Sequence, residues 1–276
     1  MADRGRLNVH RRGTGPPLLL LHGIGHRWQA WEPVLDRLAA AHEVIAVDLP
    51  GFGESPLPDD GRPLDMPNTI ARFPAYLAEL GVARPHVAGN SLGGAIALEL
   101  AAAGLAASVT AFAPAGFYAN WERRRAIAIL NGLRVQTFLP EPVLRAALRL
   151  PPIRTGNYRR LVAHPERLDR ERMVRDALAL RRAKAFRPVA RASRSYRFTA
   201  GQRLAERPEI PVTIVWGADD RILPAREAAR AREQLPHARH VLLPDCGHVP
   251  MSDQPELVAR EILATTGAAE RPSWTS

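Results

Sequence analysis

The sequence predicts an α/β fold built on a mostly parallel central sheet, and three observations lead to this prediction. Short apolar runs typical of buried strands alternate with longer segments of helical periodicity. The alternation is interrupted once, between about residues 116 and 207, where only helical patterns occur. It then resumes with two more strands and a last helix. Because strands joined through helices form βαβ units, we expect one parallel sheet with helices on both faces.

The predicted strands are short apolar or alternating segments that end at turn residues. The run from Pro17 to Leu21 is apolar throughout and stops at His22-Gly23, as expected of a strand buried on both faces. Gly51 and Gly53 follow the next strand. In order, the predicted strands are residues 7–10, 17–21, 43–48, 86–88, 109–113, 211–216 and 239–243.

The predicted helices of the sheet region occupy residues 28–41, 69–80, 92–103 and 255–265. Gly81 is expected to cap the second of these at its C-terminus. The third is apolar on nearly every side, which predicts a buried helix. Asp253 and Glu256 have the spacing of a capping box and are expected to begin the last helix.

The interrupting segment predicts an insertion above the sheet and not a second independent domain, because the alternation resumes after it. It contains amphipathic stretches at residues 121–133, 142–150 and 171–186. We therefore divide the chain into a core of residues 1–115 and 208–276 and an inserted segment of residues 116–207.

Composition excludes several classes of protein. The chain has 276 residues, of which 46% are hydrophobic and 24% charged, as in ordinary globular domains. No apolar run reaches the roughly 18–20 residues that span a bilayer, and residues 1–6 lead into no signal-type apolar stretch. The single Cys246 excludes an internal disulfide and a cysteine-rich zinc site. We expect a cytoplasmic enzyme without stable membrane insertion.

The positive charge is concentrated in the insertion. Residues 117–207 hold 22 Lys and Arg against seven Asp and Glu, while the whole chain has a net charge of +10. The simplest interpretation is a solvated outer face on the inserted helices. Attraction of acidic substrates or of an anionic membrane surface is the alternative. Nucleic acid is disfavoured as a partner, because the arginines lack interleaved aromatic residues.

The strongest local motif is Gly89-Asn90-Ser91-Leu92-Gly93, which lies between a predicted strand and a predicted helix. A sharp turn at this place lifts the serine hydroxyl clear of the sheet, and the flanking glycines leave room for it. The N-terminus of the following helix favours negative charge developing beside the serine. Ser91 is therefore the candidate nucleophile.

A serine nucleophile needs a base, and the base needs an acid to orient it. His248 follows the last predicted strand and is the only histidine of nine beyond it. The acid is expected after the strand at residues 211–216, where Asp220 is preferred over Asp219. Asp245 is a weaker candidate because it precedes His248 too closely to reach its ring.

Four further residues near these motifs have less certain roles. Cys246 is interpreted as a small packing residue and His26 as a surface histidine, with a reactive thiol and a substrate contact as the respective alternatives. Trp28 is interpreted as a packing residue, with a place in the pocket wall as the alternative. Asn90 is interpreted as a hydrogen-bonding residue within the turn, with substrate contact as the alternative.

Taken together, the motifs resemble those of the α/β-hydrolase family along nearly the whole chain. They are, in order, His22-Gly23-Ile24-Gly25, Asp48-Leu49-Pro50-Gly51-Phe52-Gly53-Glu54-Ser55, Gly89-Asn90-Ser91-Leu92-Gly93-Gly94, Trp216-Gly217-Ala218-Asp219-Asp220 with Pro224, and Gly247-His248. The resemblance implies an α/β-hydrolase fold with a mostly parallel sheet flanked by helices. It also implies that residues 116–207 form a helical cap over the pocket.

The same resemblance implies roles for individual residues. Ser91 would be the nucleophile, His248 the base and Asp220 the orienting acid. The backbone N–H groups of Leu92 and Ile24 would form the oxyanion hole. Candidate substrate-binding residues are Gly23, Trp28, Asn90, Phe117 and Val249, and the aromatic side chains of Tyr118, Trp121, Phe138 and Tyr158 are further candidates for an apolar pocket.

The expected function is hydrolysis of a carboxylic ester through an acyl-enzyme, with a small apolar or anionic ester as substrate. Haloalkane dehalogenases and epoxide hydrolases of this fold carry Asp at the nucleophile position, so Ser91 argues against both. A C–C hydrolase of the meta-cleavage-product type is one alternative, although Val249 stands where those enzymes carry Trp. A non-hydrolytic member, such as a biosynthetic cyclase or ligand receptor, is another. No metal or organic cofactor is implied, because no cluster has ligand spacing.

Overall fold

A computed structural model describes residues 6–270, so residues 1–5, for which the sequence predicts no signal-type stretch, lie outside the described residues. One seven-stranded sheet has the order β1-β3-β2-β4-β5-β6-β7, in which β1 is antiparallel to β3 and every other pair is parallel. The strands are β1 Val9–Arg12, β2 Pro17–Leu21, β3 Glu43–Val47, β4 His86–Asn90, β5 Ser108–Phe112, β6 Val212–Gly217 and β7 Arg239–Leu243. The predicted mostly parallel sheet is confirmed.

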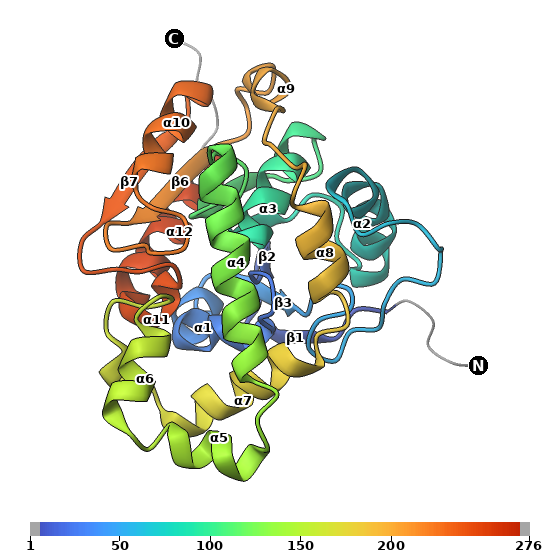
Figure 1. The fold of residues 1–276 in the computed structure, drawn as a ribbon. Coiled ribbons are helices and arrows are strands. Elements are labelled where there is room, and N and C mark those ends of the chain that lie inside the picture. The colour runs from blue at the N-terminus through green and yellow to red at the C-terminus, as the bar shows by residue number, and fades with distance from the viewer. Residues whose placement is uncertain (1–5, 271–276) are drawn as a thin grey trace.

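Helices cover both faces of this sheet (Figure 1). They are η1 Trp28–Trp31, α1 Glu32–Ala39, α2 Met66–Leu80, α3 Leu92–Ala102, α10 Arg226–Gln234, α11 Pro250–Asp253 and α12 Pro255–Glu270. Alternate residues of β2 point to opposite faces: Leu19 and Leu21 pack in one core cluster with α2 and α3, and Leu18 and Leu20 pack in another with α1 and α12. This two-faced burial explains why β2 is apolar at every position.

Two local predictions about these helices had different outcomes. Gly81 ends α2 in the left-handed conformation at φ 74°, as predicted. The capping box at Asp253 and Glu256 is wrong, because Asp253 is the last residue of α11. Its carboxylate accepts backbone N–H bonds from Ala163 at 2.9 Å, His164 at 3.1 Å and Gly247 at 2.8 Å. Asp253 thus ties the insertion to the loop that precedes His248.

Between β5 and β6 the described chain contains helices and loops but no strand. The helices are α4 Asn120–Gln136, α5 Glu141–Ala147, α6 Pro151–Tyr158, η2 Pro165–Arg167, α7 Arg170–Arg182, α8 Phe186–Ala192 and α9 Gly201–Ala205. The sequence missed α6, which begins with two prolines that occupy its first turn. It also joined α7 to Phe186, whereas Ala183 leaves the helical conformation at ψ 98°. In Figure 1, α4 crosses in front of the sheet, and α5, α6 and α7 lie at the bottom of the molecule. Among the described residues, no helix combines the length and apolarity required to cross a membrane.

Candidate functional site

Ser91 lies in the sharp turn that joins β4 to α3, with a backbone φ of 56° and ψ of −111°. A non-glycine residue rarely adopts this conformation, which costs about 1–3 kcal/mol and is typical of functional sites. A Cβ at Gly89 would overlap the carbonyl of Gly93, and a Cβ at Gly93 would overlap the carbonyl of Leu21. Both positions therefore require glycine, for the reason that the motif predicted.

His248 and Asp220 form a close buried pair beyond the ends of β7 and β6. The Nδ1 atom of His248 lies 2.7 Å from Oδ2 of Asp220, and each residue is only 5% exposed. The other carboxylate oxygen accepts the backbone N–H groups of Ile222 and Leu223, each at 2.8 Å. The Asp220 carboxylate is therefore held on both oxygens. A proton on Nδ1 of His248 leaves Nε2 of the ring able to accept another.

The rival carboxylates lie elsewhere. Asp219 is exposed to solvent although it is adjacent to Asp220, and Asp245 is also exposed. The structure therefore brings His248 together with the aspartate that the sequence preferred.

Asn90 braces the loop that carries His248. Its Nδ2 donates to the carbonyl of His248 at 2.9 Å and to that of Phe112 at 3.3 Å, and its side chain is buried. The sequence favoured hydrogen bonds within the turn, whereas the Asn90 side chain binds the end of β5 and the loop of His248 instead. Together with Asp253, which binds Gly247, it holds the histidine loop from two sides.

The loop after β2 lies directly against the nucleophile. A Cβ at Gly23 would stand 3.3 Å from Cβ of Ser91, so the chain passes close to the serine there. Ile24 and Leu92 line the same cavity as Ser91. Leu92 is the first residue of α3, where backbone N–H groups have no partner within the helix. The two segments expected to supply oxyanion donors therefore meet beside Ser91.

His22 positions this loop, a role that the sequence did not predict. Burial lowers the pKa of His22 to about 4, so its ring is neutral near pH 7. Its Nε2 accepts the N–H of Leu49 at 2.9 Å, which leaves Nδ1 to donate to the carbonyl of Gly23 at 2.7 Å. His22 thereby fixes the loop beside Ser91 to the loop after β3. The His-Gly pair at the end of a buried strand was the one signal in the sequence.

Ser91 opens into a cavity between the core and the inserted helices. Its walls are mostly apolar, with Phe52 and Leu223 on the core side and Leu130 and Val189 on the side of α4 and α8. Polar groups enter it from Arg72, Tyr76, Tyr118, Arg123 and Tyr196 among others. A cavity of this character suits a mainly apolar small molecule with a few polar contacts.

A second cavity lies under α5, α6 and α7, and Ile24 and Leu130 line both cavities. Val249, which follows His248, is part of its wall, as a substrate-contact role would require. His26 is another wall residue and is half-buried, so its interpretation as a surface histidine is wrong. Its Nδ1 atom is buried with no hydrogen-bond partner among the described residues, and burial lowers its pKa.

Four of the five candidate substrate-binding residues line neither cavity: Gly23 and Asn90, described above, and also Trp28 and Phe117. Trp28 stacks on His10 with ring centroids 4.1 Å apart, and its backbone N–H donates to Asp48 at 2.6 Å. Phe117 is 1% exposed and packs against Phe198 with centroids 5.2 Å apart. Both predictions are corrected by partners from distant segments, which turn these rings away from the cavities.

The remaining aromatic candidates divide between the cavities and the surface. Tyr118 lines the first cavity and Tyr158 the second, whereas Trp121 and Phe138 are exposed. Cys246 is fully buried, and burial raises the pKa of its thiol, which agrees with a packing role.

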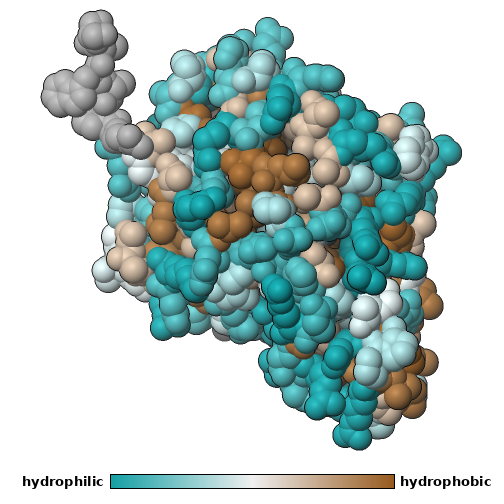
Figure 2. All heavy atoms as spheres, turned by 90° about the vertical axis from the view of Figure 1, so that its left-hand side faces the viewer, coloured by the Kyte–Doolittle hydropathy of each residue, from teal (hydrophilic) through white to brown (hydrophobic). Residues whose placement is uncertain are grey.

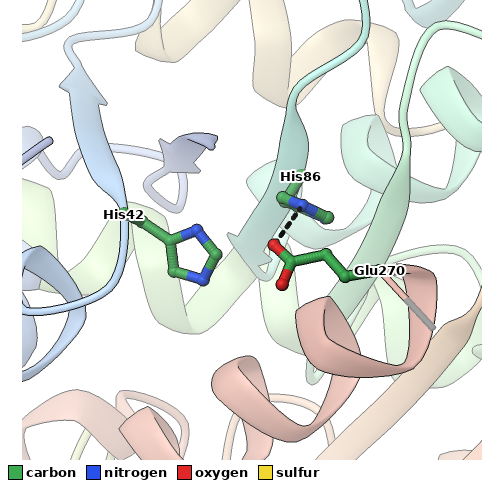
Figure 3. A group of neighbouring side chains, drawn as sticks. All are labelled: His42, His86 and Glu270. Carbon is green, nitrogen blue, oxygen red and sulfur yellow. Dashed lines mark ion pairs between the residues drawn. The ribbon is translucent and has the colours of Figure 1, made fainter. Parts of the chain in front are cut away.

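Among residues 6–270, one group of side chains could hold a metal ion, and it lies at the opposite edge of the sheet from Ser91. His42 and His86 stand at the amino ends of β3 and β4, beside Glu270 at the end of α12 (Figure 3). Both ring nitrogens of His42 already have partners, the carbonyl of Pro16 at 3.1 Å and the hydroxyl of Thr266 at 2.9 Å. Nε2 of His86 lies 3.7 Å from Glu270. This group is too remote to take part in chemistry at Ser91.

Comparisons with known proteins agree with this architecture. Residues 18–261 match the model of the alpha/beta hydrolase family. The chain is 32% identical over 266 residues to the dihydrolipoyllysine-residue acetyltransferase component of an acetoin cleaving system from Pseudomonas putida, a match that covers 91% of this chain. The chain spans only 63% of the length of that relative.

Two further matches are informative. The chain is 37% identical over 99 residues to a 2-hydroxymuconate semialdehyde hydrolase from Pseudomonas sp. (strain CF600), which is 35% of each chain. A thermophilic esterase from Thermogutta terrifontis superposes with a TM-score of 0.71 at 22% identity, over 96% of this chain and 94% of the other. At that identity the esterase supports the fold alone. By its sequence and its sheet, this chain belongs to the alpha/beta hydrolase family.

Proposed function

We propose that this protein is a serine hydrolase that cleaves a carboxylic ester with Ser91, His248 and Asp220. The observation that carries the proposal is the 2.7 Å contact between His248 Nδ1 and Asp220, at the same sheet edge where Ser91 holds a φ of 56°. Along the chain the order is Ser91, Asp220 and His248, which matches the order nucleophile, acid and base of the fold.

In the proposed mechanism, Nε2 of His248 takes the proton of Ser91 as the hydroxyl attacks the ester carbonyl. The oxyanion is stabilised by the backbone N–H groups of Leu92 and Ile24, each contributing about 10²–10³ in rate. His248 then gives its proton to the departing alcohol. Asp220 stays ionised throughout and stabilises the charged imidazole. A water molecule activated by the same histidine releases the acid and restores Ser91.

The substrate that fits best is a small ester with apolar groups, because apolar side chains dominate both cavities. The inserted helices would act as a cap, since α4 and α8 close the first cavity over Ser91. A cytoplasmic location belongs to the same proposal, because a single cysteine leaves no pair for an internal disulfide.

C–C bond hydrolysis is the second candidate function. The match to the 2-hydroxymuconate semialdehyde hydrolase favours it, and so does the sequence Gly-Asn-Ser-Leu-Gly-Gly from residue 89. It would use the same three residues on a vinylogous diketo acid.

The test combines labelling by a fluorescent fluorophosphonate with turnover of p-nitrophenyl esters from acetate to decanoate. We expect the wild type to be labelled and to turn over at least one ester. The Ser91→Ala variant should not be labelled, and its kcat should fall by several orders of magnitude, up to about 10⁶-fold. Ser193→Ala, which changes another serine of the same cavity, should label like the wild type.

The other outcomes separate the candidates. Labelling that survives in Ser91→Ala, or kcat near wild type, contradicts the assignment of Ser91. Labelling without turnover of any ester favours C–C cleavage, which is tested next with vinylogous diketo acids. Absence of labelling in the wild type favours a non-hydrolytic member of the family.

A further inference from the structure

The far end of the inserted helices exposes an unusual number of large apolar side chains. We call residues 134–160 the tip, which comprises the end of α4 together with α5 and α6, at the bottom of Figure 1. Val135 is 70% exposed and Phe138 55%. Of nine exposed large hydrophobic residues in the described chain, six belong to the tip: Val135, Phe138, Leu139, Val143, Leu150 and Ile153. Figure 2 shows brown side chains along one side of the lobe that projects at the lower right.

These side chains are not part of a core. The inward side of α5 already has one, because Leu144 and Leu148 are buried in a cluster with Met173 and Val174. The same inward residues line the second cavity. The tip is therefore apolar on both its inner and its outer side. An exposed apolar face of this kind is typical of a surface that binds another protein or a membrane.

The charge around this face is strongly positive. Residues 134–160 contain six arginines and one glutamate, and that glutamate, Glu141, is held by Arg145 at 2.9 Å. Arg149, Arg159 and Arg160 are exposed, and none of them has an ion-pair partner within residues 6–270. The tip thus offers uncompensated positive charge beside exposed apolar groups.

The exposed apolar side chains and the positive charge of the tip together indicate which kind of partner fits it. A second copy of the chain would oppose one positive tip to another, so self-association is electrostatically unfavourable. Nucleic acid would satisfy the arginines but not the apolar side chains. A bilayer with anionic headgroups satisfies both, because the apolar side chains enter the headgroup–acyl boundary while the arginines meet phosphates. We propose that the tip docks this protein reversibly on an anionic lipid surface.

Docking at the tip is separate from the ester hydrolysis proposed above and does not depend on Ser91. It has a consequence for access to the site, however. Leu133, Leu144 and Tyr158 line the second cavity from the same helices. A docked tip would therefore hold that cavity next to the lipid.

Co-sedimentation with vesicles tests the proposal in two arms. We expect the wild type to sediment with phosphatidylcholine vesicles that contain phosphatidylglycerol, and much less with phosphatidylcholine alone. In the apolar arm, V135S/F138S/L139S should bind at least about tenfold more weakly, given about 0.8 kcal/mol for each buried CH₂. The matched control is L57S/L242S, which changes exposed leucines away from the tip and should bind like the wild type.

In the charge arm, R149Q/R159Q/R160Q should bind about 100-fold more weakly, at about 1 kcal/mol for each basic residue near the surface. The control R62Q/R84Q/R232Q removes the same charge from exposed positions on the core. All variants change exposed residues, and an unchanged melting temperature verifies folding. Ser91→Ala should bind like the wild type, so failure of the proposed catalysis and failure of docking are distinguishable.

Three results would overturn the proposal. One is equal binding to neutral and anionic vesicles. Another is loss of binding in the core variants as large as in the tip variants. The third is a wild-type dimer in size-exclusion chromatography that becomes monomeric in V135S/F138S/L139S without a change in vesicle binding, since the face would then join two copies of the chain.

Discussion

Asp219 and Asp220 are neighbours in the sequence but differ sharply in burial and in hydrogen bonding. Both follow β6, but only Asp220 is buried, and its two oxygens bind His248 and two backbone N–H groups. The turn after β6 leaves the carboxylate of Asp219 in solvent and buries that of Asp220. A one-residue difference in position therefore separates a buried carboxylate bound to His248 from a solvated side chain.

Asp220→Asn should lower kcat by about 10⁴-fold while leaving the protein folded, because the amide cannot hold the correct tautomer of His248 or stabilise its charged form. Steady-state kinetics on the best p-nitrophenyl ester measures the effect. Asp219→Asn is the matched control and should retain wild-type kcat. A comparable loss in both variants would show that the two carboxylates are not distinguished as proposed.

At the scale of elements, α10 joins the inserted helices to the core through buried charge. Glu122 of α4 is 2% exposed and forms ion pairs with Arg226 and Arg230 of α10. Glu227, between them in the sequence, is fully buried, and its carboxylate oxygens have no hydrogen-bond partner among the described residues. Burial, together with the nearby charges of Glu122 and Asp220, raises the pKa of Glu227 to about 8, against the opposing effect of the two arginines.

This pKa makes the stability of the protein depend on pH. The folded state keeps the Glu227 proton up to a pH of about 8, whereas the unfolded chain loses it near 4.5. Between these values the unfolded state binds fewer protons, so the free energy of unfolding falls as pH rises, by at most about 1.4 kcal/mol per pH unit. Urea unfolding at several pH values between about 5 and 8 should show a shallower fall in Glu227→Gln than in the wild type.

The control for this experiment is Glu233→Gln, which changes an exposed glutamate of the same helix and should keep the wild-type slope. Identical slopes in the wild type and Glu227→Gln would mean that Glu227 is ionised in the folded protein.

At the scale of the whole molecule, the insertion carries more positive charge than the complete chain. Residues 117–207 have 15 more basic than acidic residues, whereas the net charge of the protein is +10. Helices of this segment line both cavities. The field above the site is therefore positive and should attract anionic molecules.

We expect kcat/KM for an anionic ester to fall steeply as salt rises, and kcat/KM for a neutral ester of the same size to change little. The reason is that salt at about 0.1 M screens charges beyond roughly 10 Å. Stopped-flow or initial-rate measurements over a salt series provide the two slopes. Equal slopes would show that the charge does not steer substrate.

The sequence by itself determined the order of the strands along the chain, the buried character of α3 and the turn at Ser91. These features depend on local patterns: apolar runs, the period of a helix, and glycines where any Cβ would collide. It also selected His248 and Asp220, because the ends of parallel strands meet at one edge of the sheet.

Only the tertiary structure decided which side chains face the cavities. Trp28 turned out to stack on His10, and His26 lines a cavity, although nothing local distinguishes them. Asp253 has the spacing of a helix cap, yet its carboxylate binds backbone groups near residues 163 and 247. Trp28 and Asp253 contact residues that lie far from them in the sequence, namely His10 and Ala163. A local sequence pattern contains no information about such distant partners. Local physics thus determined the framework and the candidate reacting residues, and long-range packing determined the shape of the space around them.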